Sequence, residues 1–146
     1  MDFKDLGLNK SILKAIAEEN YKVPTPIQQK VIPLVLEKKD VIASAQTGTG
    51  KTAAFALPIL ELLFDEQDSI KRGKKIKALV ISPTRELALQ IEQNFKTYSR
   101  YTNLRTTVVF GGINIEPQED VLRKGVDILI ATPGRLLDLH KQEVLN

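Results

Sequence analysis

Ala45-Gln46-Thr47-Gly48-Thr49-Gly50-Lys51-Thr52 follows directly on the apolar run Val41-Ile42-Ala43 and leads into the apolar residues Ala53–Leu57. A strand, a glycine-containing loop that ends in Gly-Lys-Thr, and a helix are the setting of a phosphate-binding loop. The glycines let backbone N–H groups turn toward phosphate oxygens, and the positive end of the following helix adds to the same pocket. The stretch therefore predicts a triphosphate site in which Lys51 reaches the terminal phosphates and the Thr52 hydroxyl binds Mg²⁺.

The composition is that of an ordinary globular chain. The 146 residues are 42% hydrophobic and 27% charged, which suits one core of single-domain size. There is no cysteine and a single histidine, so disulfides and thiolate metal sites are excluded and a histidine-based metal site is disfavoured. The net charge of +3 is compatible with a polyanionic partner without requiring one. Because we find no leader and no apolar stretch of about 18 residues, we expect a soluble cytoplasmic protein with no membrane partner.

Short apolar segments alternate with longer amphipathic ones from Asp40 onward. The apolar segments predict strands at Val41–Ser44, Ala78–Ser82, Thr106–Phe110 and Asp127–Ala131. The amphipathic segments predict helices at Gly50–Phe64, Thr84–Tyr98, Asn114–Arg123 and Pro133–Lys141. Because the strands are apolar almost throughout, we expect parallel pairing with helices on both faces. The predicted fold class is α/β, with a doubly wound parallel sheet.

Two helices are predicted ahead of this sheet. Asn9–Glu19 has apolar residues at helical spacing. Thr25-Pro26-Ile27-Gln28 combines an N-cap threonine, a proline at the first helical position and a glutamine at the third, which is a capping-box start for a helix running toward Leu36. We therefore expect a helical region at 1–38 ahead of a nucleotide-binding region at 39–146.

The segment Tyr21–Gln28 also has a chemical interpretation. A glutamine amide can pair with N6 and N7 of adenine, and an exposed aromatic such as Tyr21 can stack on the base. Taken alone, Gln28 is better explained as a capping residue. The phosphate-binding loop downstream favours the adenine interpretation, in which the two features together select ATP over GTP.

Polar or glycine-rich turns follow three of the predicted strands, at Pro83–Ala88, Gly111-Gly112 and Thr132–Arg135. The carboxyl ends of parallel strands meet at one edge of a sheet, so we expect these turns to face the same side as Lys51. Helix N-termini with an arginine beside them suit contacts to a nucleic-acid backbone. The alternative is that the threonines are ordinary helix N-caps and the glycines only permit turns.

Together these segments resemble the first RecA-like domain of the DEAD-box ATP-dependent RNA helicases. Tyr21–Gln28 is similar to the Q motif, with Phe3 at the position of its upstream aromatic. Ala45–Thr52 is similar to motif I, and Pro83–Ala88 is similar to motif Ia. Gly111-Gly112 is similar to the double-glycine element, and Thr132–Arg135 is similar to motif Ib. Phe110–Gly112, Pro117-Gln118 and Gly125–Asp127 are similar to the bacterial RhlE-like branch. Ala45 and Asn20 stand where these motifs usually have glycine. Asparagine tolerates left-handed backbone angles, so we expect little effect at Asn20.

The resemblance implies a RecA-like P-loop domain with ATP and Mg²⁺ as cofactors and RNA as partner. It implies that Tyr21 and Gln28 hold adenine with Phe3 packing nearby, and that the phosphates and Mg²⁺ are bound by Gln46, Thr47, Gly48, Thr49, Gly50, Lys51 and Thr52. It assigns contacts with the RNA backbone to Pro83, Thr84, Arg85, Gly111, Gly112, Thr132, Gly134 and Arg135. Because backbone contacts read no bases, we expect RNA binding that does not depend on sequence.

The Asp-Glu-Ala-Asp segment and the Ser-Ala-Thr motif of the family occur nowhere in the 146 residues. P-loop enzymes use an acidic residue near the loop to help hold Mg²⁺. We therefore expect an incomplete first helicase domain that is catalytically inactive by itself, whereas its parent is an RNA-stimulated ATPase that unwinds or remodels RNA. We also expect the uncovered sheet edge to favour self-association.

Two other classes of protein share part of this pattern. A P-loop kinase or another small NTPase would contain Ala45–Thr52 and the same fold, but it has no need of Tyr21–Gln28. A nucleotide-free RNA-binding module would keep the fold as a scaffold, and the intact Gly-Lys-Thr triplet argues against it. Only a working phosphate-binding loop would lose affinity for an ATP analogue when Lys51 is replaced by alanine.

Overall fold

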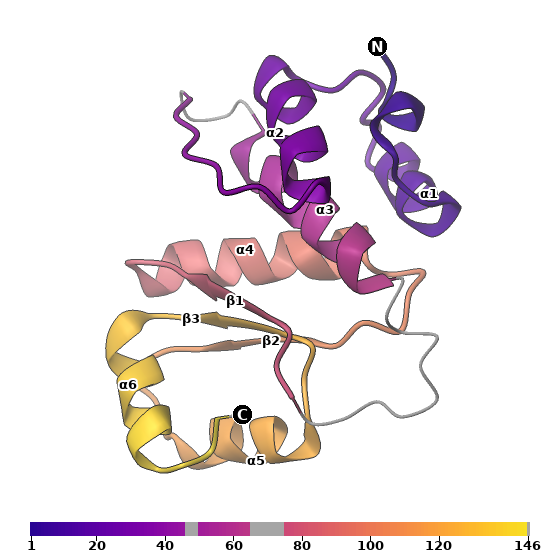
Figure 1. The fold of residues 1–146 in the computed structure, drawn as a ribbon. Coiled ribbons are helices and arrows are strands. Elements are labelled where there is room, and N and C mark those ends of the chain that lie inside the picture. Colours follow the sequence, from indigo (N-terminus) through magenta and orange to yellow (C-terminus); the bar gives the residue numbers. More distant parts are fainter. Residues whose placement is uncertain (46–49, 65–74, 146) are drawn as a thin grey trace. The chain divides into compact units, whose positions relative to one another are not determined.

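The computed structural model describes residues 1–45, 50–64 and 75–145 (Figure 1). Its elements are a 3-10 helix η1 (Phe3–Leu6), α1 (Lys10–Glu18), α2 (Pro26–Leu36), α3 (Lys51–Phe64), β1 (Ala78–Ile81), α4 (Arg85–Tyr98), β2 (Thr106–Val109), α5 (Glu116–Lys124), β3 (Ile128–Ala131) and α6 (Pro133–Lys141). The described residues form two compact units. The first unit is Met1–Asp68 with Asn94–Asn103, and the second unit is Ser69–Gln93 with Leu104–Asn146. The predicted division into 1–38 and 39–146 stays a prediction.

The first unit is helical, and α1 and α2 begin directly after the N-cap residues predicted from the sequence. The Asn9 side chain accepts a hydrogen bond from Ile12 N–H at the start of α1. At the start of α2, Thr25 Oγ1 accepts from Gln28 N–H and Gln28 Oε1 accepts from Thr25 N–H, so the predicted capping box is confirmed. Helix α3 packs along α2. Buried apolar side chains of this unit include Phe3, Leu6, Ile12, Ile16, Val31, Ile32, Leu57, Leu60 and Phe95.

The second unit is built on a parallel sheet with the strand order β1-β3-β2. Strand β3 is buried along its whole length, as expected for a central parallel strand. Helices α5 and α6 lie together on one face of the sheet (Figure 1). The core on that face consists of Val109, Leu122, Val126, Leu129, Ala131, Leu139 and Val144. The predicted α/β class and three of the predicted strands are confirmed, with ends that differ by one residue.

The prediction of a strand at Val41–Ser44 is wrong for this structure. Residues 41–45 have no regular secondary structure, and Ile42 is fully exposed. An apolar run forms a strand only where a neighbouring strand accepts its backbone hydrogen bonds. The described strands all lie in the second unit, whereas Val41–Ser44 belongs to the first.

Helix α5 begins two residues later than the predicted start at Asn114. The Asn114 side chain accepts a hydrogen bond from Glu116 N–H at 3.0 Å, which is a local turn rather than a helical hydrogen bond. The asparagine therefore precedes the helix instead of opening it. Among the described helices, none combines the length and apolar character needed to span a bilayer.

Candidate functional site

The end of the predicted phosphate-binding loop lies at the start of α3. Gln46, Thr47, Gly48 and Thr49 lie outside the described residues. Helix α3 begins at Lys51, which is exposed, and Thr52 is half-buried beside it. Ala54 N–H donates to Gly50 C=O at 3.1 Å, and the first turn of α3 carries no acidic residue. At the positive end of a helix, the exposed ammonium of Lys51 is suited to bind a phosphate group, and the hydroxyl of Thr52 is suited to bind the cation that accompanies it.

Gly50 is held in a conformation that only glycine adopts easily. Its φ is +83°, in the left-handed region. A Cβ added at this position would lie 2.3 Å from Gln28 Nε2. Gln28 Nε2 in turn donates to Gly50 C=O at 3.2 Å. The loop therefore ends in direct contact with the start of α2, although the two residues are 22 positions apart in the chain.

Gln28 uses both of its amide atoms within the protein. Its side chain is 3% exposed, Oε1 accepts from Thr25 N–H at 3.0 Å, and Nε2 donates to Gly50 C=O. The capping role that the sequence suggested for Gln28 is therefore confirmed. An amide oxygen has two lone pairs and an amide nitrogen has two N–H donors, so each atom retains capacity for one more hydrogen bond. Pairing of Gln28 with adenine stays a prediction.

Tyr21 follows the turn that ends α1 and is 41% exposed. Asn20 before it has a φ of 62°, so the expectation that asparagine would accept a left-handed conformation is confirmed. Tyr21 N–H donates to Ile16 C=O at 3.2 Å, which fixes the backbone where the segment Tyr21–Gln28 begins. Phe3, the upstream aromatic, is buried at 3% exposure and contributes to the core of the first unit.

In the second unit, the three predicted turns come together at one edge of the sheet. Ile81 and Val109 both pair with Ala131 in the parallel register, so β1, β2 and β3 end side by side. Ser82 N–H donates to Ala131 C=O, and Thr132 N–H donates to Val109 C=O. The residues brought to this edge are Pro83, Thr84, Arg85, Gly111, Gly112, Thr132, Gly134 and Arg135. That Lys51 faces the same side stays a prediction, because it belongs to the first unit.

The two threonines of these turns differ in their capping roles. Thr84 Oγ1 accepts from Leu87 N–H at 3.2 Å, so Thr84 caps α4 as the alternative interpretation suggested. Thr132 makes no such bond at the start of α6. Arg85 is exposed, and its guanidinium carbon lies 5.9 Å from the centre of the Phe110 ring. The Arg85 side chain therefore lies beside the double-glycine turn that follows Phe110.

Arg135 is buried rather than exposed, at 8%. Its Nη1 donates to Gln118 Oε1 at 2.9 Å, and its Nη2 donates to Ile113 C=O at 2.8 Å. Gln118 Nε2 donates to Phe110 C=O at 3.1 Å. In this structure Arg135 thus ties the start of α6 to α5 and to the segment around the double glycine, and a direct contact with RNA stays a prediction.

Sequence reasoning missed the role of Gln118. The residue is only 8% exposed, on a helix in which most residues are polar or charged. A buried side-chain amide needs hydrogen-bond partners, and Gln118 finds them in Arg135 and in the carbonyl of Phe110. The usable signal was its position, because it falls on the side of α5 that also carries the buried residue Leu122, one turn later.

Two glycines of these turns are not required by the fold. A Cβ added at Gly111 or at Gly134 would meet no atom within 4 Å, and neither residue has a positive φ. Gly112 differs, because its φ is +85° and a Cβ there would lie 3.6 Å from Arg85 Nη1. Open space above a glycine lets another backbone approach closely. Gly111 and Gly134 therefore support the interpretation of this edge as a ligand surface.

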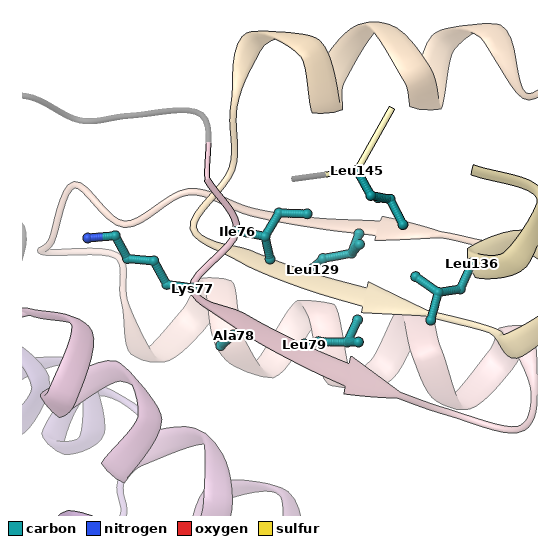
Figure 2. A pocket seen from close by; sticks show the side chains of 7 residues that line it. All are labelled: Ile76, Lys77, Ala78, Leu79, Leu129, Leu136 and Leu145. Carbon is teal, nitrogen blue, oxygen red and sulfur yellow. The ribbon is translucent and has the colours of Figure 1, made fainter. Parts of the chain in front are cut away.

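An apolar hollow of about 270 Å³ also lies in the second unit (Figure 2). It is lined by Ile76, Lys77, Ala78, Leu79, Leu129, Leu136 and Leu145. Six of these seven side chains are hydrocarbon and Lys77 is the one charged residue among them, so the hollow differs in chemistry from both predicted sites. Within the described part of the chain, no group of three or more His, Cys, Asp or Glu residues could hold a metal ion.

Residues 25–146 match the family model described as DEAD/DEAH box helicase. The chain belongs to the DEAD/DEAH box helicase family. It is 49% identical over 141 residues to the DEAD-box ATP-dependent RNA helicase RhpA of Helicobacter pylori, covering 97% of this chain and 27% of that protein. It is 48% identical over 136 residues to the ATP-dependent rRNA helicase RRP3 of Gibberella zeae, covering 93% of this chain and 27% of that protein. The chain thus spans about a quarter of the length of these curated relatives.

A solved structure titled as a hypothetical ATP-dependent RNA helicase from Sulfolobus tokodaii has the same fold. The TM-score is 0.83 at 40% identity, with 94% of this chain and 38% of that chain covered. The predicted RecA-like helicase fold and the predicted family are therefore confirmed. The RhlE-like branch stays a prediction, because the relatives include both bacterial and fungal helicases.

Proposed function

We propose that this chain is the ATP-binding N-terminal part of a DEAD-box RNA helicase, which couples ATP binding and hydrolysis to unwinding or remodelling of RNA duplexes. The observation that carries the proposal is the hydrogen bond between Gln28 Nε2 and Gly50 C=O. It joins the residue suited to read adenine to the end of the loop suited to bind phosphates. The relatives named as ATP-dependent RNA helicases support the same function.

ATP would be held by residues of the first unit. Tyr21 and Gln28 would bind the adenine base, and Lys51 with the loop Gln46–Gly50 would bind the phosphates. Thr52 would donate its hydroxyl oxygen to Mg²⁺, which when bound neutralises charge on the phosphates. The exposed Lys51 and the positive end of α3, whose first turn carries no acidic residue, support this assignment, because they offer an anion both a charge and N–H donors.

RNA would bind at the edge of the sheet in the second unit. Arg85 and the N-termini of α4 and α6 would contact phosphate oxygens, and the open sides of Gly111 and Gly134 would let the RNA backbone approach. Arg135 would act mainly by holding the double-glycine turn in position. Contacts of this kind read the sugar-phosphate backbone, so we expect similar affinity for RNAs of different sequence.

The 146 residues by themselves are proposed to be catalytically inactive and prone to self-association. They contain no Asp-Glu-Ala-Asp segment to help hold Mg²⁺ and position water. The outer edge of β1 has no strand paired to it in the described structure, and Leu79 and Ile81 on this strand are about half exposed. RNA-stimulated phosphate release would contradict the first point, and a stable monomer in gel filtration at high concentration would contradict the second.

A titration with a fluorescent ATP analogue tests the nucleotide site. Replacing Lys51 with alanine removes a charge-assisted hydrogen bond to phosphate, so we expect the affinity to fall by roughly 10- to 100-fold. Lys10→Ala is the matched control, because Lys10 is likewise an exposed lysine at the first position of a helix in the same unit. Equal affinity of wild type and Lys51→Ala would favour the rival function, an RNA-binding module without a nucleotide.

A further inference from the structure

The end of α4 is attached to the end of α1 within the first unit. Arg100 Nη2 contacts Glu19 Oε2 at 2.7 Å, and Arg100 Nη1 contacts Glu18 Oε1 at 3.2 Å. The Tyr101 hydroxyl donates to Glu18, and Lys14 Nζ lies 4.2 Å from the centre of the Tyr101 ring. Each exposed ion pair contributes little, but several contacts on one helix end restrict its position. These contacts hold the turn from which Tyr21 emerges.

The backbone of that turn leaves Tyr21 little freedom except in its side chain. Asn20 is left-handed, and Tyr21 N–H is bonded to Ile16 C=O. The orientation of the Tyr21 ring is then decided by what its side chain touches. A half-exposed aromatic with a free choice of rotamer would lose conformational entropy on binding a base, whereas a ring already held in place would not.

Tyr98 is the residue that Tyr21 touches. The two ring centres are 6.1 Å apart and the rings are tilted by 55°. The Tyr98 hydroxyl donates to the Tyr21 hydroxyl over 3.4 Å, which is long for such a bond. Tyr98 is only 2% exposed, and its hydroxyl has no other hydrogen-bond partner among the described residues. A buried phenol hydroxyl needs a hydrogen-bond partner. This contact therefore gives the Tyr98 hydroxyl its partner and at the same time orients the ring of Tyr21.

We propose that the Tyr98 hydroxyl is a positioning group for Tyr21 and thereby strengthens the preference of this chain for adenine nucleotides over phosphate groups alone. The inference rests on the proposed function, in which the adenine base binds on Tyr21. Tyr98 does not itself contact the nucleotide. It acts by holding the Tyr21 ring ready to stack, so its removal weakens binding of the base and leaves binding of the phosphates unchanged.

The test compares two ligands, ATP and inorganic triphosphate, each titrated calorimetrically with Mg²⁺ into the purified 146-residue chain. Tyr98→Phe keeps the ring and removes the hydroxyl. We expect this change to lower the affinity for ATP by roughly two- to tenfold, which is the effect of losing one hydrogen bond. The affinity for triphosphate should stay unchanged. Ser99→Ala is the matched control, because it removes a buried hydroxyl at the same helix end that donates to the Phe95 carbonyl and not to Tyr21. It should leave the ratio of the two affinities as in wild type.

A double variant separates positioning from general loosening of the structure. Tyr21→Phe/Tyr98→Phe should bind ATP no more weakly than Tyr98→Phe alone, because both single changes remove the same contact. A wild-type ratio of affinities in Tyr98→Phe would overturn the inference and leave the proposed function standing. A wild-type protein that binds ATP no better than triphosphate would overturn the assignment of adenine to Tyr21, and the inference with it.

Discussion

The proposed nucleotide site around Gly50 and the proposed RNA edge around Gly111 and Gly134 use glycine in opposite ways. Gly50 is required by the protein itself, because its backbone is left-handed and Gln28 occupies the space that a Cβ would need. Gly111 and Gly134 have no such requirement and face open space. The first region is therefore held together by contacts within the protein, whereas the second leaves room for something outside it. Substitution of glycine should therefore destabilise the fold in the first region and not in the second.

The largest effect is expected at Arg135, which is buried beneath the proposed RNA edge. Arg135→Met removes two charge-assisted hydrogen bonds and leaves Gln118 and the Ile113 carbonyl without this partner, so the free energy of unfolding should fall by about 3 kcal/mol. Urea denaturation measures it. Arg123→Met is the control, because Arg123 is exposed and, among the described residues, pairs only with Glu119 and Asp120 on the same helix, so its loss should cost less than about 1 kcal/mol. Equal effects of the two changes would mean that burial of Arg135 is unimportant.

Gly50→Ala should have the next largest effect. The substitution strains a left-handed backbone and pushes against Gln28 Nε2, so we expect a loss of about 2 kcal/mol in the free energy of unfolding. Binding of the ATP analogue should weaken in parallel. Gly111→Ala serves as control and should leave the free energy of unfolding within about 0.5 kcal/mol of wild type. Full stability of Gly50→Ala would mean that the contact between Gln28 and Gly50 is not formed in solution.

Gly134→Ala should affect binding and stability in opposite directions. The residue lies in the first turn of α6 with space around it, so alanine should raise the free energy of unfolding by about 0.5 kcal/mol. The added methyl group narrows the approach for an RNA backbone, and we expect a several-fold loss of affinity for a single-stranded RNA in fluorescence anisotropy at constant salt. Unchanged RNA affinity would indicate that this edge does not bind RNA through Gly134.

The smallest effect concerns pH and the first unit. Burial, and secondarily the hydrogen bond with Tyr21, raise the pKa of Tyr98 above its ordinary value of 10.0. Because folding raises this pKa, the native state keeps a proton that the unfolded chain loses. The contribution of Tyr98 to the free energy of unfolding is therefore fully present below pH 10 and is lost as the pH rises further. Thermal unfolding should show a steeper loss above pH 10 in wild type than in Tyr98→Phe. Identical slopes would contradict the burial of the Tyr98 hydroxyl.

Helix caps and turns are predictable from the sequence because their hydrogen bonds join residues that are close in the chain. The capping box of Thr25 and Gln28 and the left-handed Asn20 each depend on a few neighbouring residues whose chemistry is visible in the sequence. The three apolar strands of the second unit were also predictable. The strand expected at Val41–Ser44 was not formed, because pairing depends on a partner that an apolar run does not specify.

The sequence by itself determined the family, the phosphate-loop motif, the helices and the three strands of the second unit, since these depend on residue types at fixed spacing. Only the tertiary structure decided how the site residues are used. Gln28 bonds the Gly50 carbonyl, Arg135 bonds Gln118, and the Tyr98 hydroxyl bonds the Tyr21 hydroxyl, each across many positions of the chain. The physical reason is that a buried polar group must find a partner, and which partner lies within reach is decided by how the helices pack.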